Sequence, residues 1–156
     1  SGMTEDPRYQ VYPPNLWEPH RTYRHEVGED MYGLLGISRE DKAGRLQHLR
    51  SNYQFFGAPV GLFFSMHRSF GHAQWADLGI MMQTIMLLAV ENGLGSCAQE
   101  SWSFWPDTIG NFLGLPEDHI LFAGMAIGYP DPSACVNRLR SRRADLATYV
   151  SFRGFA

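Results

Sequence analysis

The residues best suited to bind an anion lie near the end of the chain, where four arginines fall within six positions. Arg138, Arg140, Arg142 and Arg143 belong to the run 137–143. Crowded guanidinium groups repel one another unless an anion or carboxylates lie nearby, and the planar donor fork of arginine matches phosphate oxygens. The run therefore predicts either a phosphate site or a solvated basic face that pairs with acidic neighbours, which is the commoner role of a charge run.

A second segment, 93–102, has the sequence GLGSCAQESW and directly follows a long apolar stretch. We expect it to end in an exposed turn. Taken alone, the pattern favours an ordinary connection between a helix and a strand.

Other chemistries have weak support. His67 and His72 lie five residues apart in an expected loop, without the spacing or the neighbouring ligands of a metal site. Cys97 is a nucleophile in principle, but it follows an apolar run and is expected to be a buried, inert thiol. The chain has no nucleophile elbow, no Walker loop and no dinucleotide fingerprint. We therefore predict no metal and no catalytic side chain.

Composition narrows the class of protein and its expected cellular setting. The chain has 156 residues, 44% of them hydrophobic, and a net charge of -3, which excludes the basic footprint of a nucleic-acid-binding protein. Cys97 and Cys135 form no CxxC pair, so a reducing, cytoplasmic setting is expected. No uninterrupted apolar run is long enough to span a membrane, and residues 1–14 lack the pattern of a signal peptide.

The chain is expected to fold as one domain behind an arm. Residues 1–17 contain several prolines and no helical or strand period, so they predict an extended arm that either is held in place by another surface or is disordered. Residues 18–156 contain no repeat and no linker, and they predict a single domain.

Two helices are expected before the first strand. The apolar stripe over 20–35 predicts a helix that stops at Gly36. Ser38 is the expected N-cap of the second helix, with Asp41 as a capping-box carboxylate, and this helix is expected to run to about Gln54.

The remaining elements follow from apolar runs and breaker residues. Strands are expected at 60–66, 94–98 and 120–128, and helices at 106–113 and 144–149. Gly124 and Gly128 within the last strand predict a close approach of other atoms to the backbone.

The strongest helix is expected over 74–92, ending at Gly93. Its apolar residues cover nearly the whole circumference, so the helix must be buried on nearly all sides. A domain of this size offers few places to bury such a helix, and an obligate dimer interface would supply the missing cover.

Taken in order, the motifs of this chain resemble those of the FMN-dependent nitroreductase family. The resemblance spans residues 8–154, and no single motif decides it; the ordered set is specific. Its main segments are YQFFGAPV (53–60), QWADLG (74–79), ENGLG (91–95), QESW (99–102), FLGLP (112–116), ILFAGMAIGY (120–129) and VNRLR (136–140).

The resemblance implies an α/β (α+β) fold in which helices flank a central, mostly antiparallel sheet. It implies a homodimer formed through long helices, with FMN at the interface and in contact with both subunits. It also implies an enzyme, an oxidoreductase that takes electrons from NAD(P)H and passes them through FMN to nitroaromatic or quinone acceptors.

By the same resemblance, Ala98, Gln99, Glu100 and Ser101 match the segment that lies against the isoalloxazine ring. In the family, a backbone N–H near the Glu100 position approaches flavin N5, where a fixed dipole tunes the ring. Ser101 stands where many relatives have glycine. Arg140 and Arg143 match the positions that hold the FMN phosphate, and Arg142 is a competing choice.

The resemblance covers the C-terminal two-thirds of the family pattern. The arginine-rich segment that opens the family and grips the FMN phosphate has no counterpart, nor has the later segment that touches the ring. We therefore expect a domain truncated at its N-terminus that binds FMN less tightly than full-length relatives. The alternative function is a remnant of the fold with weak or no FMN binding and little catalysis. A branch that performs dehalogenation or flavin breakdown would need lid residues that we do not identify.

Overall fold

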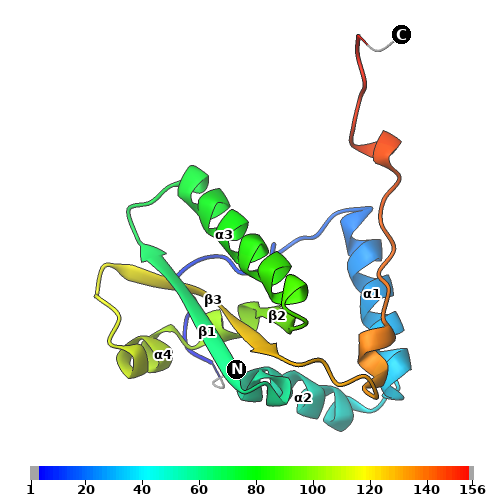
Figure 1. Ribbon diagram of the computed structural model, residues 1–156, viewed down its shortest axis with the longest axis horizontal. Helices are drawn as coiled ribbons and strands as arrows, with labels where there is room; N and C mark the ends of the chain where they lie inside the picture. Colours follow the sequence, from blue (N-terminus) through cyan, green and yellow to red (C-terminus); the bar gives the residue numbers. More distant parts are fainter. Residues whose placement is uncertain (1–3, 155–156) are drawn as a thin grey trace. The chain divides into compact units, whose positions relative to one another are not determined.

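The computed structural model of the chain describes residues 4–154 (Figure 1). The contacts between these residues divide the chain into two units. The first, here called the sheet unit, contains the residues up to Asn15 and Asp41–Asp131. The second, the α1 unit, contains Leu16–Glu40 and the residues from Pro132 onward. The predicted division into an arm at 1–17 and one domain at 18–156 stays a prediction, and residues 1–3 of that arm lie outside the described residues.

A three-stranded antiparallel sheet forms the centre of the sheet unit. Its strands are β1 (Val60–His67), β2 (Gly95–Gln99) and β3 (His119–Gly128), and their order in space is β1-β3-β2. The last strand in the chain is thus the central one, paired on both sides. The expected strands and the expected α+β class with an antiparallel sheet are confirmed.

A β-bulge in β3 decides which side chains reach each face of the sheet. The register shifts after Phe64, which pairs with Ala123, whereas the next residue, Ser65, pairs with Leu121. Phe122 is the extra residue, and both Phe122 and Ala123 pack in the cluster on one face, while Leu121 packs in the cluster on the other. Without the shift, Leu121 and Ala123 would lie on the same face of the sheet; with it, they lie on opposite faces.

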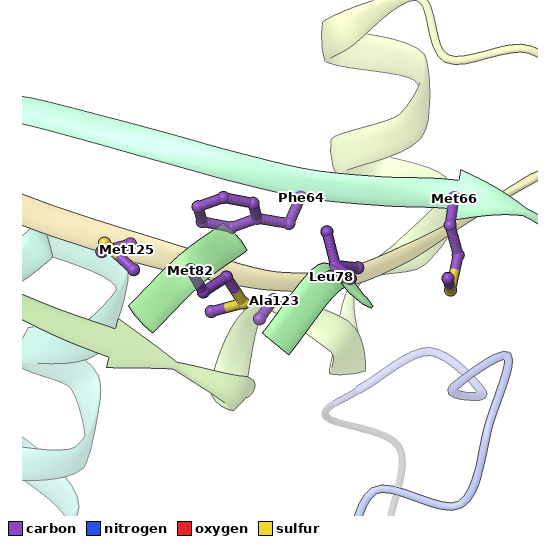
Figure 2. Close-up of a cluster of buried hydrophobic side chains, with 6 residues drawn as sticks. All are labelled: Phe64, Met66, Leu78, Met82, Ala123 and Met125. Atoms are coloured by element: carbon purple, nitrogen blue, oxygen red, sulfur yellow. The ribbon is translucent and has the colours of Figure 1, made fainter. Parts of the chain in front are cut away.

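The long helix α3 (His72–Glu91) covers one face of the sheet (Figures 1 and 2). Leu78 and Met82 of the helix meet Phe64 and Met125 of the strands, as Figure 2 shows. The predicted helix is confirmed, and it begins two residues earlier than expected. The opposite face packs against η2 (Glu100–Phe104), α4 (Pro106–Leu113) and the turns of η1 (Ser51–Gly57).

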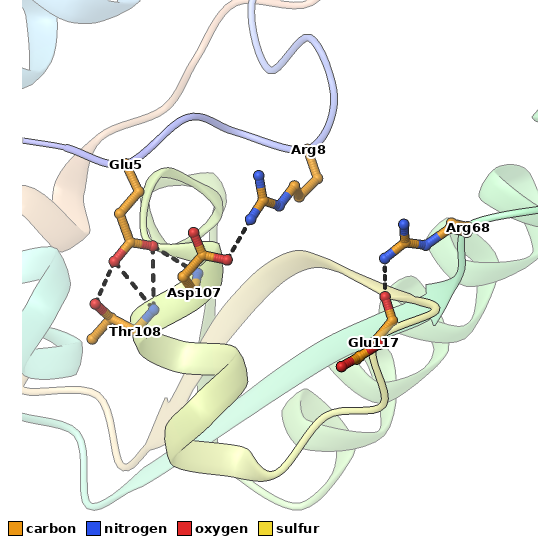
Figure 3. A network of polar contacts seen from close by, with 6 residues as sticks. All are labelled: Glu5, Arg8, Arg68, Asp107, Thr108 and Glu117. Atoms are coloured by element: carbon orange, nitrogen blue, oxygen red, sulfur yellow. Dashed lines mark hydrogen bonds and ion pairs between the residues drawn. The ribbon is translucent and has the colours of Figure 1, made fainter.

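Residues 5–9 contact the sheet unit through side-chain hydrogen bonds. Glu5 accepts hydrogen bonds from the backbone N–H groups of Asp107 and Thr108 at the start of α4, and Arg8 pairs with Asp107 (Figure 3). The Tyr9 hydroxyl donates to the carbonyl of Phe122 at 2.6 Å. These bonds hold residues that have no regular structure of their own.

The second helix differs from expectation at both ends. It is α2 (Lys42–Arg50), and its N-cap is Asp41, whose carboxylate accepts from Gly44 N at 2.8 Å, so the prediction of Ser38 as the cap is wrong. The helix ends at Arg50 and not near Gln54, because the chain tightens there into the 3-10 turns of η1.

In the α1 unit, helix α1 (His20–Leu35) and its left-handed stop at Gly36 are confirmed. The tail forms two 3-10 turns, η3 (Cys135–Arg138) and η4 (Leu146–Thr148). The helix expected at 144–149 is therefore only a single turn, which Asp145 caps through the N–H of Ala147.

Candidate functional site

The segment 98–101 ends the edge strand β2 and enters the first turn of η2. Along it, Ala98 and Glu100 are exposed, whereas the side chain of Gln99 between them is only 1% exposed. This alternation follows from the extended backbone, in which successive side chains point to opposite faces. One side of the segment is therefore open to solvent while the other is anchored in the protein.

Gln99 anchors the segment through its amide group. Its Nε2 donates to the carbonyl oxygen of Asn52 at 2.8 Å, and its Oε1 accepts from Trp102 Nε1 at 3.4 Å. A buried amide is costly unless it is hydrogen-bonded, and here both ends have partners. The amide thereby connects β2 to η1 on one side and to η2 on the other.

Trp102 is the centre of an aromatic cluster on the same face of the sheet. Its ring lies 4.8 Å from that of Phe55, 5.1 Å from that of Phe63 and 5.3 Å from that of Tyr53, measured between centroids. The Tyr53 hydroxyl donates to the carbonyl of Ser101 at 3.3 Å. The turn at the end of 93–102 was expected to be exposed, but Trp102 and Ser103 are buried because they pack under β3.

The η1 turn that faces this cluster has an unusual backbone. Phe55 and Phe56 have φ of 50° and 51°, in the left-handed region that residues with a side chain rarely adopt, and Gly57 follows at 81°. Such a conformation costs free energy and persists where the surrounding packing determines it. The Phe55 ring lies where a side chain at Gly61 would be, 2.2 Å from its ideal Cβ, so packing on the sheet fixes this turn.

Cys97 is exposed, so the expectation of a buried thiol is wrong. It lies on β2, which is an edge strand with no further strand beside it among the described residues. Desolvation by its neighbours nevertheless raises the pKa of the Cys97 thiol. A raised pKa lowers the fraction of reactive thiolate at neutral pH, which supports the expectation of an inert cysteine.

The predicted phosphate ligands belong to the α1 unit. Arg142 forms an ion pair with Glu26 of α1 at 2.8 Å, which matches the alternative expectation of a basic run with acidic neighbours. Arg140 and Arg143 use Nη1 on nearby backbone carbonyls, and within residues 4–154 neither pairs with a carboxylate. Their guanidinium groups keep donors for an anion.

A cavity of about 350 Å³ opens within the α1 unit beside Arg142 and Arg143. Arg142 and Arg143 line it together with Glu26 and Asp30. An anion inside this cavity would meet two carboxylates as well as two guanidinium groups.

In the structure, Ala98 and Gln99 end β2, and Glu100 and Ser101 begin η2, all within the sheet unit. Arg140 and Arg143 lie on one segment of the α1 unit. Sequence reasoning missed the side chains that anchor the first group. Asn52 carries no signal of its role in the sequence, whereas the glycine at 124 does hint at a bulky neighbour. Among the residues that the structure describes, no three His, Cys, Asp or Glu side chains gather as metal ligands.

Comparisons with known proteins agree on one family. The model of the Nitroreductase family matches residues 20–129. The 4-nitrobenzoate reductase of Pseudomonas putida is 38% identical over 143 residues, which are 92% of this chain and 63% of that protein. The chloronitrobenzene nitroreductase of Comamonas testosteroni is 34% identical over 146 residues, 94% of this chain and 64% of that protein. The chain therefore spans a little under two thirds of the length of these curated relatives.

Solved structures show the same likeness. The FMN- and NADPH-dependent nitroreductase NfnB from Sphigopyxis sp. strain HMH superposes with a TM-score of 0.93 at 47% identity, covering 96% of this chain and 67% of that one. The FMN-dependent nitroreductase NfnB from Mycobacterium smegmatis, in complex with NADPH, gives a TM-score of 0.84 at 30% identity and covers 93% of this chain and 66% of that one.

Proposed function

The chain belongs to the nitroreductase family, and on this premise we propose that it is an FMN-dependent oxidoreductase that passes electrons from NAD(P)H to nitroaromatic or quinone acceptors. The observation that supports this most directly is the 98–101 segment. It is fixed from the inside by Gln99 and open on the outside, which is what a segment that lies against a flat ring requires.

The residues present fit a bound flavin. Ala98 is small and exposed, so a planar ring can approach the backbone there, and Glu100 and Ser101 follow directly. Arg140 and Arg143 retain guanidinium donors for a phosphate. FMN, when bound, supplies the redox chemistry, and the protein supplies position and electrostatics. No side chain of this chain need act as an acid or base.

The apolar surface of α3 supports a homodimer. Leu78, Met82 and Ala89 of the helix are buried against the sheet unit, yet Leu87 and Val90 are 62% and 69% exposed. By length and composition alone the helix could also cross a membrane. The buried stripe favours a helix that packs on a sheet, so we propose that a second copy covers the exposed side. With Cys97 and Cys135 unpaired, we place the protein in the cytoplasm.

The alternative function is a family member that holds FMN weakly and turns over little. Two observations favour it: Arg142 is already paired with Glu26, and two carboxylates line the cavity beside Arg143. Both would reduce the attraction of the α1 unit for a phosphate.

One experiment separates the two functions. The purified chain is titrated with FMN, passed through gel filtration, and its visible absorbance is recorded. NADPH or NADH is then added without oxygen, followed by 4-nitrobenzoate. Retained flavin bands that bleach with the nicotinamide and return with the nitroaromatic are expected. Protein that elutes colourless and does not consume the nitroaromatic would replace the proposal by its alternative.

A further inference from the structure

Two polar side chains in the described part of the chain are fully buried, and both flank the same peptide. Gln99 is 1% exposed and Ser103 is 0% exposed. Gln99 precedes Glu100, and the Ser103 hydroxyl donates to the carbonyl of Glu100 at 2.7 Å. Polar groups are buried at a cost that apolar residues of similar size would avoid. The burial of these two polar side chains next to Glu100 therefore suggests that they have a role at this peptide.

The Ser103 bond fixes the direction of the Glu100–Ser101 peptide. In a planar trans peptide the C=O and the following N–H point in opposite directions. Since the Glu100 carbonyl accepts a bond from the buried Ser103 hydroxyl, the Ser101 N–H points away from Ser103. A different rotation of this peptide would break the 2.7 Å bond from the Ser103 hydroxyl to the Glu100 carbonyl.

Gln99 fixes the position of the same peptide. Its amide bonds to Asn52 and to Trp102 hold the residue before Glu100 between two neighbouring segments. Asn52 lies in η1, the element that contains the left-handed residues Phe55 and Phe56, so the amide of Gln99 ties the segment to that turn. Translation is thus restrained by Gln99 and rotation by Ser103.

We propose that Gln99 and Ser103 are positioning residues that aim the Ser101 N–H at the flavin. The inference rests on the proposed function, because it concerns how the chain presents its backbone to FMN. Neither side chain touches the ring: both act from beneath, through the peptide that they orient. A donor held in a fixed direction before the cofactor arrives loses no free energy to reorientation when the cofactor binds.

Two variants test the proposal, each with a matched control. Ser103→Ala removes the hydroxyl from the 2.7 Å bond to Glu100, and Thr148→Val removes an equal 2.7 Å bond from Thr148 to Asp145 in the other unit. Gln99→Met replaces the buried amide by an apolar chain of similar length, and Gln47→Met does so at an exposed site on α2. Ser103→Ala is the smaller change and keeps the test open should Gln99→Met fail to fold.

Three measurements distinguish a positioning role of Gln99 and Ser103 from a general effect on the stability of the protein. In the FMN-free protein, hydrogen exchange of the Ser101 amide is expected to accelerate in both test variants. In the FMN titration, the Kd is expected to rise roughly 5- to 20-fold, the scale of one or two lost hydrogen bonds. The visible bands and the midpoint potential of the bound flavin are expected to shift, whereas a variant that is only less stable leaves them unchanged.

The outcomes are distinct. Folded Ser103→Ala and Gln99→Met proteins with the wild-type Kd, flavin spectrum and midpoint potential would overturn the positioning role and leave the proposed function intact. A wild-type protein that binds no FMN would overturn the proposed function instead. Equal effects in the control variants would also overturn the positioning role.

Discussion

The indole ring of Trp102 occupies the space beside the backbone of Gly124, where an ideal Cβ would lie 2.3 Å from Trp102 Cδ1. No real Cβ tolerates such a distance, so any side chain at Gly124 must move the ring. Because the ring also contacts Phe55 and Phe63, it has little room to move. The glycine is therefore part of the packing of the aromatic cluster.

The first prediction follows directly. Gly124→Ala is expected to destabilise the protein by about 1–3 kcal/mol, the usual cost of overpacking a core. Gly110→Ala in α4, where nothing lies within 4 Å of the added Cβ, is the control and is expected to be neutral or to stabilise by about 0.5–1 kcal/mol. Urea unfolding measures both. Equal stability of the two variants would contradict the observed contact.

A second prediction concerns the exposed side of α3. Leu87→Glu places a charge on the face that we propose a second copy covers, so the dimer is expected to dissociate. Light scattering after gel filtration measures the mass. Phe112→Glu on α4 is the control, because Phe112 is 81% exposed and equally apolar but lies on another helix. A wild-type protein that elutes as a monomer would refute the dimer before any variant is made.

A third prediction concerns pH and the N-terminal arm. The pKa of Glu5 is lowered from its ordinary 4.5, first by the hydrogen bond from the Thr108 hydroxyl and also by backbone N–H groups of α4 and by Arg8. A lowered pKa means that the ionised carboxylate stabilises the fold above the ordinary pKa, and that this stabilisation is lost as the pH falls through the lowered value.

Wild-type protein is therefore expected to be more stable than Glu5→Gln at about pH 7, with the difference shrinking once the pH falls below about 4.5. Urea unfolding at several pH values gives the comparison. Asp6→Asn, one residue along the same arm, is the control. A difference that grows in acid would show that the assigned sign is wrong.

A fourth prediction tests the phosphate ligands. Arg143→Met is expected to raise the Kd for FMN about 10-fold or more, the scale of a charged hydrogen bond, and to leave the Kd for riboflavin unchanged because riboflavin has no phosphate. Arg142→Met, which removes a partner of Glu26, is the control and is expected to have the smaller effect on FMN. Similar losses for both flavins would indicate damage to the fold.

The sequence predicts the elements whose signals are local. The apolar stripe of α3, the proline that opens α4 and the glycines that end α1 and α4 lie where the pattern requires. The close approach expected at Gly124 is confirmed, and so is that at Gly128, where a Cβ would lie 2.8 Å from Pro59 Cδ. The helix ends depend on residues that are close in the chain, and the close approaches depend on the missing side chain of glycine.

Ser38 and Asp41 are both good caps by residue type, and the structure uses Asp41, whose carboxylate accepts from Gly44 N. The other features that the sequence does not predict depend on distant partners. Nothing local marks Phe55 and Phe56 as left-handed, because the aromatic cluster determines their backbone. The exposure of Cys97 follows from strand order, and the burial of Gln99 follows from Asn52, which is 47 residues away.

The order of the strands also bears on how the protein is made. Both outer strands are synthesised before β3, the strand with which each of them pairs. A nascent chain that has left the ribosome as far as residue 118 holds two strands with no partner and an apolar helix with no sheet to cover. Chains in that condition aggregate or engage chaperones. The sheet can therefore form only after the ten residues of β3, its central strand, have been synthesised.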